Sequence, residues 1–552
     1  MLEKYAAAQF KDYNDFVQNY HIKVPANFNF AFDCVDELAA LYPDKTALVW
    51  CNDKGIQKEY SFSQMAALVD AAARYLSSLG IKKGDKVMLM LKRRAQFWFV
   101  LLGLIKLGAV AIPATHLLTK KDIIYRNNAA STKAIITVED EAIVQAAESA
   151  MEESPTVTTL IKLGEARPGW HCLDEGIAAH MQGEALQRCT QNTDMMLLYF
   201  TSGTTGMPKM VAHNFVYPLG HISTARYWHN LGPGSLHLTV ADTGWAKAAW
   251  GKIFGQWMCE AAVFVYDHDV FNAADLLSVV SKHKVTSFCA PPTVFRFMIK
   301  ENLAAYDLSA LQYVTTAGEP LNAEVFYQFK QKTGLVIREC YGQTEMTPII
   351  ITSPYSQPCP GSMGLPSPAY DVVLLNEEEK EVGVGEEGEI CVKTQLAAQP
   401  GVFMGYYRDE NLTKSMWKHG IYHTGDKAYK DDGGYYWYIG RVDDVIKSSG
   451  YRIGPFEVES ALIEHPAVLE CAVTAAPDEV RGQAVKASIV LAKGYQPTDE
   501  LKKELQNHVK KTTAPYKYPR IVEFVQDLPK TISGKIQRRI IREKSHQEQK
   551  YR

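Results

Sequence analysis

Two parts of the chain alternate short β-branched runs with segments of helical periodicity, and this alternation limits the fold more than any other feature. In the first part, residues 87–91, 109–112 and 134–137 are expected to be strands, and residues 94–107 and 120–128 helices. In the second, the expected strands are 286–290, 313–317 and 336–340, with helices from Thr293 and Asn322. Strand–helix alternation is typical of parallel sheets covered by helices. We therefore predict an α/β fold with two helix-covered, mainly parallel sheets.

The remainder of the chain has a different character. Residues 354–430 are rich in Pro and Gly with short strands, which favours an antiparallel β subdomain. Beyond Gly440, the pattern of strands and helices is sufficient for a small α+β domain. A chain of 552 residues is too long for one core, so we predict a large domain of residues 1–441 and a small one of 442–552. The polar tail, 543–552, is expected to be frayed.

Charge and hydropathy narrow the possible partners. The net charge is −3, which offers no electrostatic footprint for nucleic acid or an anionic membrane. The most apolar stretch, residues 97–114, is interrupted by Lys106 and Pro113. It therefore favours a buried helix and strand over a membrane span. We expect no nucleic-acid partner and no stable membrane insertion, and a homo-oligomer is compatible with the sequence.

The ten cysteines are scattered, without a Cys-x-x-Cys pair or a Cys/His cluster along the sequence. This spacing predicts neither a disulfide framework nor a structural zinc site, and it fits a reducing compartment. The first twenty residues contain Glu3, Asp12 and Asp15 and no apolar run, unlike a signal or transit peptide. The expected location is the cytoplasm.

One segment gathers groups that bind phosphate. Tyr199-Phe-Thr-Ser-Gly-Thr-Thr-Gly-Met-Pro-Lys209 follows an apolar, strand-like run. Glycines let backbone N–H groups turn toward a polyanion, hydroxyls donate to phosphate oxygens, and Lys209 adds a positive charge. The spacing is not that of a Walker A loop. The segment predicts that a polyphosphate is bound and leaves the reaction open.

This string closely resembles the phosphate loop of the adenylate-forming superfamily, which includes acyl-CoA synthetases, amino-acid-activating domains and luciferases. Further segments resemble that family's motifs in the family's order: Thr316-Ala-Gly-Glu-Pro320, Glu339-Cys-Tyr-Gly-Gln-Thr-Glu345, Tyr422-His-Thr-Gly-Asp426, residues 440–459, and residues 528–538. The resemblance covers nearly the whole chain. It is closest to the medium-chain acyl-CoA synthetase branch and to archaeal relatives that use branched short acids. It implies an acid–thiol ligase that joins a carboxylic acid to CoA through an acyl-adenylate, with release of AMP and diphosphate.

The resemblance implies an ATP site built from several motifs. The residues that it assigns to ATP are Thr201, Ser202, Gly203, Thr204, Thr205, Gly206, Lys209, Gly318, Glu319, Pro320, Glu339, Cys340, Tyr341, Gly342, Gln343, Thr344, Asp426, Arg441, Arg452 and Lys535. Among these, Tyr341 would stack on adenine, Thr344 would contact the α-phosphate, and Asp426 would accept both ribose hydroxyls. Glu345 would help to hold Mg²⁺, which prefers hard oxygen ligands.

Residues of the last motifs are implied to act in catalysis and domain motion. Lys535 resembles the adenylation lysine, which would act with Thr344 and Glu345 where negative charge develops on the phosphorus oxygens. An incoming thiol cannot share the carbonyl with that lysine, so the family rotates its small domain between half-reactions. Asp443 resembles the hinge of that rotation. Arg441 resembles the ribose-contacting arginine, and Arg452 the one that meets the α-phosphate.

Free CoA is the expected thiol, because no carrier-protein region follows Lys535. The resemblance assigns a set of residues on the small domain to CoA: Ser449, Gly450, Tyr451, Arg481, Tyr518, Pro519 and Arg520. Basic side chains in this set suit a 3′-phosphate.

The acyl pocket is assigned to Trp245, Lys247, Trp250 and Gly342. Gly342 stands where acetyl-CoA synthetases carry the tryptophan that closes their pocket. Without that tryptophan, the pocket has room for further methylene groups of the acid, each worth about 0.8 kcal/mol when buried. Four tryptophans (Trp228, Trp245, Trp250 and Trp257) surround Lys247 in the sequence, and an indole would refill part of that room. We expect short- to medium-chain aliphatic acids, branched ones included, with aromatic acids such as benzoate as an alternative.

Two other functions stay open at this point. An acid–AMP ligase that loads a carrier protein would differ in not using CoA alone as acceptor. A non-catalytic nucleotide-binding regulator could lose Lys535 and Glu345 without penalty, yet both are present.

Overall fold

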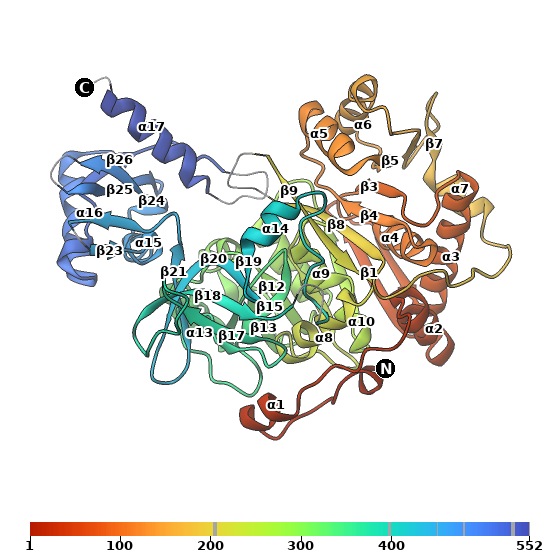
Figure 1. The fold of residues 1–552 in the computed structure, drawn as a ribbon, viewed down its shortest axis with the longest axis horizontal. Helices are drawn as coiled ribbons and strands as arrows, with labels where there is room; N and C mark the ends of the chain where they lie inside the picture. Colours follow the sequence, from red (N-terminus) through yellow and green to blue (C-terminus); the bar gives the residue numbers. More distant parts are fainter. Residues whose placement is uncertain (202–206, 396–398, 450, 479–480, 531–535, 551–552) are drawn as a thin grey trace.

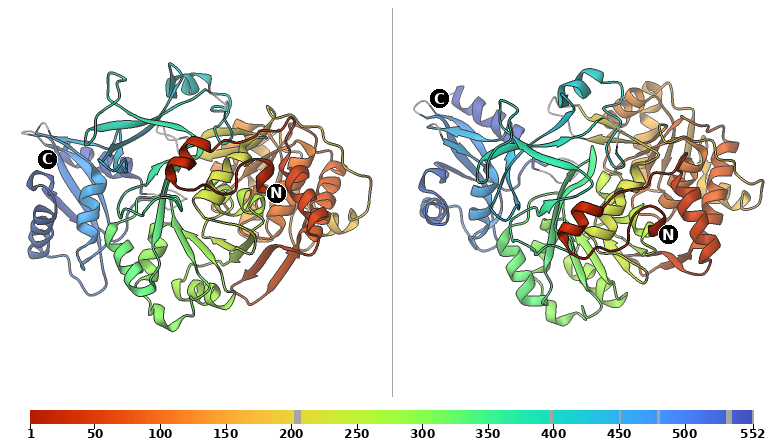
Figure 2. Two further views of the ribbon diagram at one scale, coloured as in Figure 1. Left: turned by 90° about the horizontal axis from the view of Figure 1, so that it is seen from below. Right: turned by 60° about the horizontal axis from the view of Figure 1, so that its bottom comes forward.

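The computed structural model describes residues 1–201, 207–395, 399–449, 451–478, 481–530 and 536–550, and these residues form four sheets. Three sheets belong to a large N-terminal part. The fourth belongs to a small C-terminal part at one end of the molecule (Figures 1 and 2).

The first sheet has the strand order β7-β6-β5-β3-β4-β8-β9 and is parallel except for the β8–β9 hairpin. Its strands are β3 (Lys86–Met90), β4 (Val110–Pro113), β5 (Thr132–Thr137), β6 (Thr159–Lys162), β7 (His171–Cys172), β8 (Met195–Thr201) and β9 (Lys209–Asn214). The helices from this part of the chain are α3 (Phe62–Ser78), α4 (Gln96–Leu107), α5 (Lys120–Ala130), α6 (Glu141–Ser149) and α7 (Leu173–Ala179).

The second sheet has the order β16-β15-β14-β13-β12-β10-β11-β1-β2, with parallel pairing from β14 to β1 and antiparallel pairing at both edges. Its strands are β1 (Thr46–Asn52), β2 (Gln57–Ser61), β10 (Leu236–Thr239), β11 (Ala262–Asp267), β12 (Ser287–Ala290), β13 (Tyr313–Thr316), β14 (Ile337–Gln343), β15 (Met346–Ile351) and β16 (Leu365–Pro366). The helices from this part are α8 (Tyr217–Tyr227), α9 (Ala246–Lys252), α10 (Gly255–Met258), α11 (Ala273–Lys282), α12 (Pro292–Met298) and α13 (Ala323–Thr333). Near the N-terminus lie α1 (Tyr13–Asn19), a π-helical turn (Ala31–Asp36) and α2 (Glu37–Leu41).

The third sheet is antiparallel and forms the β subdomain. It contains β17 (Asp371–Leu375), β18 (Glu387–Lys393), β19 (Trp417–Lys418), β20 (Ile421–Lys430) and β21 (Tyr436–Arg441), with α14 (Glu410–Met416) before β19. The fourth sheet contains β22 (Ile446–Ser448), β23 (Tyr451–Ile453), β24 (Val468–Asp478), β25 (Gly482–Leu491) and β26 (Ile521–Phe524). Its helices are α15 (Pro455–Ile463), α16 (Asp499–Thr512) and α17 (Arg538–Lys550). The predicted fold class, two helix-covered mainly parallel sheets, a β subdomain and a small α+β unit, is confirmed.

Helix α4 shows why the most apolar stretch stays inside the protein. Every residue of α4 from Phe97 to Lys106 is buried, because the helix packs on α3 and the seven-stranded sheet. The amine of Lys106 forms ion pairs of 2.6 Å with Asp36 and 2.5 Å with Asp70, so a buried charge is compensated. None of the described helices combines the length and apolar character that crossing a bilayer requires.

The C-terminal tail differs from the expectation of fraying. Residues up to Lys550 continue helix α17. Ile541 is buried against Leu528 and Ala472, and the hydroxyl of Ser545 accepts a hydrogen bond from Lys486. One apolar position per few turns is too weak a periodic signal to reveal a helix, but it is sufficient to dock one.

Contacts of helix α15 help to join the small part to the large one. The side-chain amide of Asn322, the N-cap of α13, donates to the carbonyl of Ser460 on α15. Tyr438 of β21 lies edge-on to Phe456 of α15, with ring centroids 6.1 Å apart. Between the two parts, β21 ends at Arg441 and β22 begins at Ile446. The division at residue 441 stays a prediction.

Candidate active site

The carboxylate of Asp426 is the centre of a polar cluster at the junction of two sheets. Asp426 lies on β20 and is buried. Its Oδ2 accepts hydrogen bonds of 2.7 Å from the hydroxyl of Tyr341 and from the amide of Gln343, both on β14. Its Oδ1 accepts from the hydroxyl of Tyr438 on β21 at 3.1 Å. Three donors therefore hold one ionised carboxylate in a fixed orientation, and each oxygen keeps capacity to accept from a ligand.

The same cluster extends to its neighbours. Tyr422 donates to the amide oxygen of Gln343 at 3.0 Å, and Gln343 also donates to the carbonyl of Thr424. Arg441 stands opposite Asp426 in the β20–β21 pair, and its guanidinium lies beside Gly425. Burial alone would lower the pKa of Arg441, but the carboxylates of Asp426 and Asp443 raise it above its usual range. The guanidinium therefore stays charged beside the cluster.

Glu345 lies in the turn between β14 and β15, a short distance along the chain from Tyr341. It is buried, and its Oε1 accepts a 2.8 Å hydrogen bond from the hydroxyl of Tyr406. The ring of Tyr406 lies 5.1 Å from the amine of Lys209. Burial lowers the pKa of Lys209, and the charge of Glu345 opposes that shift. Tyr406 thus links the predicted metal carboxylate to the lysine of the phosphate loop.

The phosphate loop is the connection of the β8–β9 hairpin, in which Thr201 pairs with Lys209. The strand pair explains how Lys209 comes to lie at the loop. The loop members Ser202, Gly203, Thr204, Thr205 and Gly206 lie outside the described residues, as do Gly450 and Lys535. Below the loop, the imidazole of His213 on β9 contacts the carbonyl of Thr344 at 2.8 Å. Burial lowers the pKa of His213 to about 3, so this contact is made by the neutral ring.

The remaining ATP candidates on the large part have other partners. Gly318 has a φ of +107°, which favours glycine, and it begins the turn that follows β13. Glu319 accepts from the backbone N–H of Thr293 at 3.1 Å and therefore caps the neighbouring helix; Pro320 follows in the same turn. Glu339 is buried beneath that turn, where it accepts from the N–H of Leu321, and burial raises its pKa. Cys340 is buried on the same strand. The structure thus brings Tyr341, rather than Glu339, to Asp426.

Trp250 occupies the space beside Gly342. A Cβ on Gly342 would lie 2.9 Å from the indole of Trp250 and 2.9 Å from Cα of Pro348. Lys247, one turn earlier on α9, donates to the carbonyl of Ala317 at the end of β13. Trp228 and Trp257 are fully buried and belong to the core. Their indole N–H groups donate to backbone carbonyls. Trp250 is thus a predicted pocket residue that the structure brings to Gly342, and Trp245 occupies the N-cap position of α9 without a side-chain hydrogen bond to the helix.

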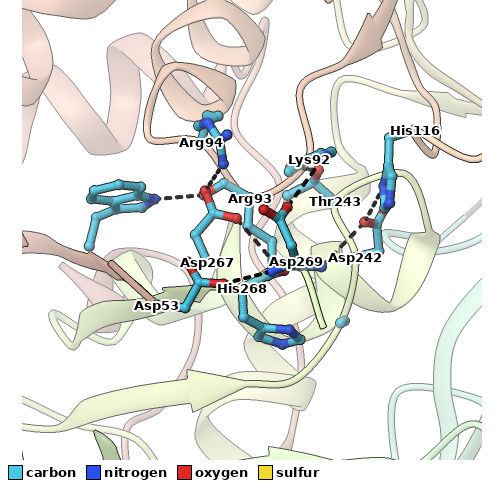
Figure 3. A network of polar contacts seen from close by, with 12 residues as sticks. Asp53, Lys92, Arg93, Arg94, His116, Asp242, Thr243, Asp267, His268 and Asp269 are labelled. Carbon is cyan, nitrogen blue, oxygen red and sulfur yellow. Dashed lines mark hydrogen bonds and ion pairs between the residues drawn. The ribbon is translucent and has the colours of Figure 1, made fainter. Parts of the chain in front are cut away.

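A buried polar network holds the segment 241–245 in place (Figure 3). Asp242 lies 3.5 Å from both Arg93 and His116, and Thr243 donates to the carbonyl of Lys92. Burial would raise the pKa of Asp242, but the hydrogen bond from His116 and the charge of Arg93 keep it below its usual range. The segment leading to Trp245 is therefore anchored to the end of β3.

In the same network, acidic residues at the end of β11 pair with basic residues that follow β3. Arg94 bonds Asp267, and Lys92 lies 3.3 Å from Asp269. Lys252 of α9 is buried nearby and donates to the carbonyl of Ala241 at 2.7 Å. Burial lowers its pKa to about 7.

Arg452, a candidate on the small part, has its described partner outside the Asp426 cluster. Arg452 on β23 forms a 2.9 Å ion pair with Glu377, in the turn after β17. The structure thus brings Arg452 to the β subdomain and not to the described ATP candidates. Asp443 lies 3.6 Å from Arg441, and its neighbour Asp444 pairs with Arg542 of α17.

Several described CoA candidates are close in sequence to one aromatic pair or hydrogen-bonded to its neighbours. Tyr451 stacks on Tyr516 with ring centroids 4.1 Å apart and planes 16° apart, and both rings are exposed. On one side, the N–H of Ser449 donates to the carbonyl of Arg481, which itself pairs with Asp478. On the other, the cations of Lys510 and Arg520 lie 4.0 and 4.8 Å from the ring of Tyr518, and Pro519 accepts from Gln506. The patch is basic and aromatic.

Sequence reasoning missed Tyr406, Tyr438 and Tyr516. Tyr406 forms an isolated bridge with Val211, and Tyr438 lies within β21. Neither belongs to a motif, and their roles depend on which segments are neighbours in the fold. Tyr516 lies two residues before Tyr518, so the aromatic spacing Tyr516-Lys-Tyr518 was the available signal.

Family models and known proteins agree with this architecture. The model described as AMP-binding enzyme matches residues 35–407, and the AMP-binding enzyme C-terminal domain matches residues 457–535. The acyl-coenzyme A synthetase ACSM3, mitochondrial, of Mus musculus is 40% identical, covering 97% of this chain and 93% of its own. The acyl-coenzyme A synthetase ACSM4, mitochondrial, of Homo sapiens is 41% identical, covering 94% and 91%.

Among solved structures, the anthranilate CoA ligase AuaEII in complex with anthranoyl-AMP is similar. It superimposes with a TM-score of 0.87 at 28% identity and covers 96% of this chain and 99% of its own. The matched models span both the large and the small part, and the relatives extend over nearly the whole chain. The chain belongs to the AMP-binding, adenylate-forming enzyme family, and it is an AMP-forming acyl-CoA synthetase, a ligase.

Proposed function

We propose that the protein joins fatty acids of short to medium chain length, branched ones included, to CoA through an acyl-adenylate. The overall reaction consumes the acid, ATP and CoA and yields acyl-CoA, AMP and diphosphate. The observation that carries the proposal is the carboxylate of Asp426, which Tyr341, Gln343 and Tyr438 hold with three donated hydrogen bonds. A buried, oriented carboxylate is a good acceptor for the two adjacent hydroxyls of a ribose.

Glu345 is the proposed ligand of Mg²⁺. The side chain is buried, and among the described residues it makes no salt bridge; its described partner is the neutral phenol of Tyr406. A buried carboxylate without a paired cation fits a hard divalent ion. When bound, Mg²⁺ would neutralise charge on the β- and γ-phosphates. Lys209, with Thr201 and the predicted loop residues 202–206, would bind the same leaving diphosphate.

Thr344 and Lys535 are proposed to act on the α-phosphate. The imidazole of His213 fixes the backbone of Thr344 from below, so its side chain has a defined position. The acid attacks the α-phosphorus, and the bond to the diphosphate breaks. The ammonium of Lys535 would offset the negative charge of that transition state.

The two half-reactions are proposed to use different positions of the small domain, with Asp443 as hinge. Arg452 pairs with Glu377 in the structure, and its proposed place on the α-phosphate requires it to leave that partner. An exposed ion pair is worth about 0–1 kcal/mol, so this exchange costs little. The boundary at residue 441 and the hinge are supported by the change of sheet between Arg441 and Ile446.

CoA is proposed to bind the patch around Tyr451 and Tyr516. The face of two stacked rings offers a surface for adenine, and the cations of Arg481 and Arg520 suit phosphate groups. The same patch includes Ser449, which is predicted to lie beside the pantetheine arm, and the neighbours of Tyr518, which are predicted for the nucleotide end of CoA.

The acid proposal is supported by the contact between Trp250 and Gly342. An indole that fills the space beside Gly342 leaves less room than the missing side chain alone would suggest, which favours short and medium chains. An aromatic acid is the second candidate, because the similar AuaEII structure holds anthranoyl-AMP. The cytoplasmic location stays a prediction, because ACSM3 and ACSM4 are both described as mitochondrial.

Two assays test the proposal. Acid-dependent exchange of diphosphate into ATP measures adenylation, and CoA-dependent release of AMP measures the complete reaction. With a panel from acetate to octanoate plus benzoate, kcat/KM is expected to be highest for an aliphatic acid between propionate and octanoate. Preference for benzoate would select the aromatic alternative. Exchange without CoA-dependent product would point to a carrier protein as acceptor.

A further inference from the structure

Three side chains of metal-binding types meet on strands β18 and β20 of the β subdomain, although up to 34 residues separate them in the sequence. Glu389 and Cys391 are two residues apart on β18 and therefore share one face of the sheet. His423 stands directly opposite Cys391 on the neighbouring strand β20. A carboxylate, a thiol and an imidazole are thus presented by two paired strands.

The distances among the three ligand atoms suit a single small ion. Nδ1 of His423 lies 3.0 Å from Oε2 of Glu389 and 3.5 Å from Sγ of Cys391. All three atoms lie within 4.8 Å of one another. In a tetrahedral zinc site with Zn–N of about 2.0 Å and Zn–S of about 2.3 Å, nitrogen and sulfur are about 3.5 Å apart.

Hydrogen bonds among these groups leave the imidazole poorly satisfied. Nδ1 carries either one hydrogen or one lone pair, so it can serve Glu389 or Cys391 but not both. The other ring nitrogen, Nε2, is buried and has no hydrogen-bond partner among the described residues. A cation at the centre of the three atoms engages all of them, and the nitrogen then no longer has to serve two partners.

We propose that Glu389, Cys391 and His423 bind one Zn²⁺ ion. Sulfur and nitrogen ligands select zinc over magnesium, so the ion would be distinct from the one assigned to Glu345. Three protein ligands leave a fourth position for water or a small anion. The carboxylate is the most exposed of the three side chains and marks the side from which the ion enters.

Binding at this site would release a proton. Burial raises the pKa of the Cys391 thiol, and the charge of Glu389 adds to that effect, so the free thiol is protonated at neutral pH. The ion takes the place of that proton, which passes to solvent as the S–H bond is replaced by a metal–sulfur bond.

Glu389 connects the proposed zinc site to the polar cluster around Asp426. The other oxygen of Glu389, Oε1, accepts a 2.9 Å hydrogen bond from the N–H of Gly425, the residue before Asp426. An ion that draws Glu389 toward itself would loosen this bond and raise the KM for ATP. This consequence, unlike the site itself, rests on the proposed role of Asp426.

Co²⁺ titration of the chelator-treated, full-length protein tests the site without any assay of activity. The wild type is expected to show thiolate-to-cobalt charge-transfer absorption that saturates at one equivalent and is lost when Zn²⁺ is added. Cys391→Ser and His423→Asn are expected to lower the affinity at least tenfold. Cys51→Ser, a buried strand cysteine, and Cys189→Ser, an exposed one, are the matched controls and should titrate as wild type.

Two results would overturn the site. One is a wild type that gives no thiolate–cobalt absorption; the other is a band that persists in Cys391→Ser or disappears in Cys189→Ser. If Cys391→Ser does not fold, the same comparison is made with Glu389→Gln and His423→Asn, with calorimetric Zn²⁺ binding as readout. With Mg²⁺ supplied, a normal diphosphate exchange rate in the zinc-free wild type separates failure of this site from failure of the proposed function.

Discussion

The hydroxyl of Tyr406 donates a 2.8 Å hydrogen bond to Glu345, and the ring of the same residue lies 5.1 Å from the amine of Lys209. One side chain thus positions both the predicted metal carboxylate and a cation of the phosphate loop. No motif in the sequence marks Tyr406.

Tyr406→Phe is expected to slow diphosphate exchange about tenfold or more and to raise the Mg²⁺ concentration needed for half-maximal rate. The reason is that a hydrogen bond to a charged group is worth about 1.5–3 kcal/mol. Tyr407→Phe is the control, because Tyr407 faces Lys86 and Arg408 instead. A Mg²⁺ dependence equal to wild type would show that Tyr406 has only a structural role.

Asp426→Asn is expected to raise the KM for ATP at least tenfold. The amide would turn an N–H group toward Tyr341, Gln343 or Tyr438, all of which donate. It would also abolish discrimination between ATP and 2′-deoxy-ATP, which competition assays measure. Asp432→Asn, in the turn between β20 and β21, is the neutral control; unchanged discrimination in Asp426→Asn would contradict the ribose assignment.

Trp250→Leu is expected to raise the kcat/KM ratio of octanoate to butyrate about tenfold. The smaller side chain opens room beside Gly342, and each buried methylene adds about 0.8 kcal/mol. Trp257→Leu serves as control because its indole lies in the core and bonds Ala47. It should lower the melting temperature without moving the ratio. Equal ratios in both variants would remove Trp250 from the acyl pocket.

Tyr451→Ala is expected to raise the KM for CoA several-fold and to leave diphosphate exchange unchanged, because the stack with Tyr516 lies on the small domain. Stopped-flow transfer from preformed acyl-adenylate to CoA measures the affected step. Tyr327→Ala, an exposed tyrosine on α13, is the control. A loss in adenylation instead would show that the patch serves the first half-reaction.

The lowered pKa of Lys252 is expected to make the free energy of unfolding depend on pH. Burial lowers the pKa of this amine from 10.5, its usual value, to about 7 in the folded protein. Between pH 7 and pH 10.5, the amine is therefore protonated in the unfolded chain and neutral in the folded one. The free energy of unfolding from this group therefore rises as pH increases from about 7 to about 10.5. Lys252→Met should abolish that rise, measured as the difference between the two proteins in urea unfolding at several pH values. Parallel curves would refute the buried, shifted amine.

Most elements of the fold could be predicted because their signals are local. Apolar runs predicted β4 and β13 to within one residue, and helical periodicity predicted α4 to within two. Helix α17 was missed because few apolar positions dock it: among its described side chains, Ile541 is buried in an apolar cluster and Ser545 is buried at a hydrogen bond to Lys486. Periodicity along the sequence shows how much of a helix face is apolar, but it does not show whether another element of the fold packs against that face.

The site was predictable where its members share a motif. Tyr341, Gln343 and Asp426 fall in two strings, and the structure brings them into hydrogen-bond contact. Tyr438 and the pair of Cys391 with His423 could not be predicted, because strand order decides which residues are neighbours. Arg452 illustrates another limit: sequence gives its motif, but the position of the small domain determines its partner.

The donors around Asp426 come from two different sheets, with Tyr341 on β14 and Tyr438 on β21. ATP would therefore bind a surface that exists only after both sheets have docked. A ligand at a hundred times its Kd stabilises the docked chain by about 2.7 kcal/mol. Bound nucleotide would thus raise the free energy of unfolding of this junction, and removing it is expected to make the junction more susceptible to proteolysis.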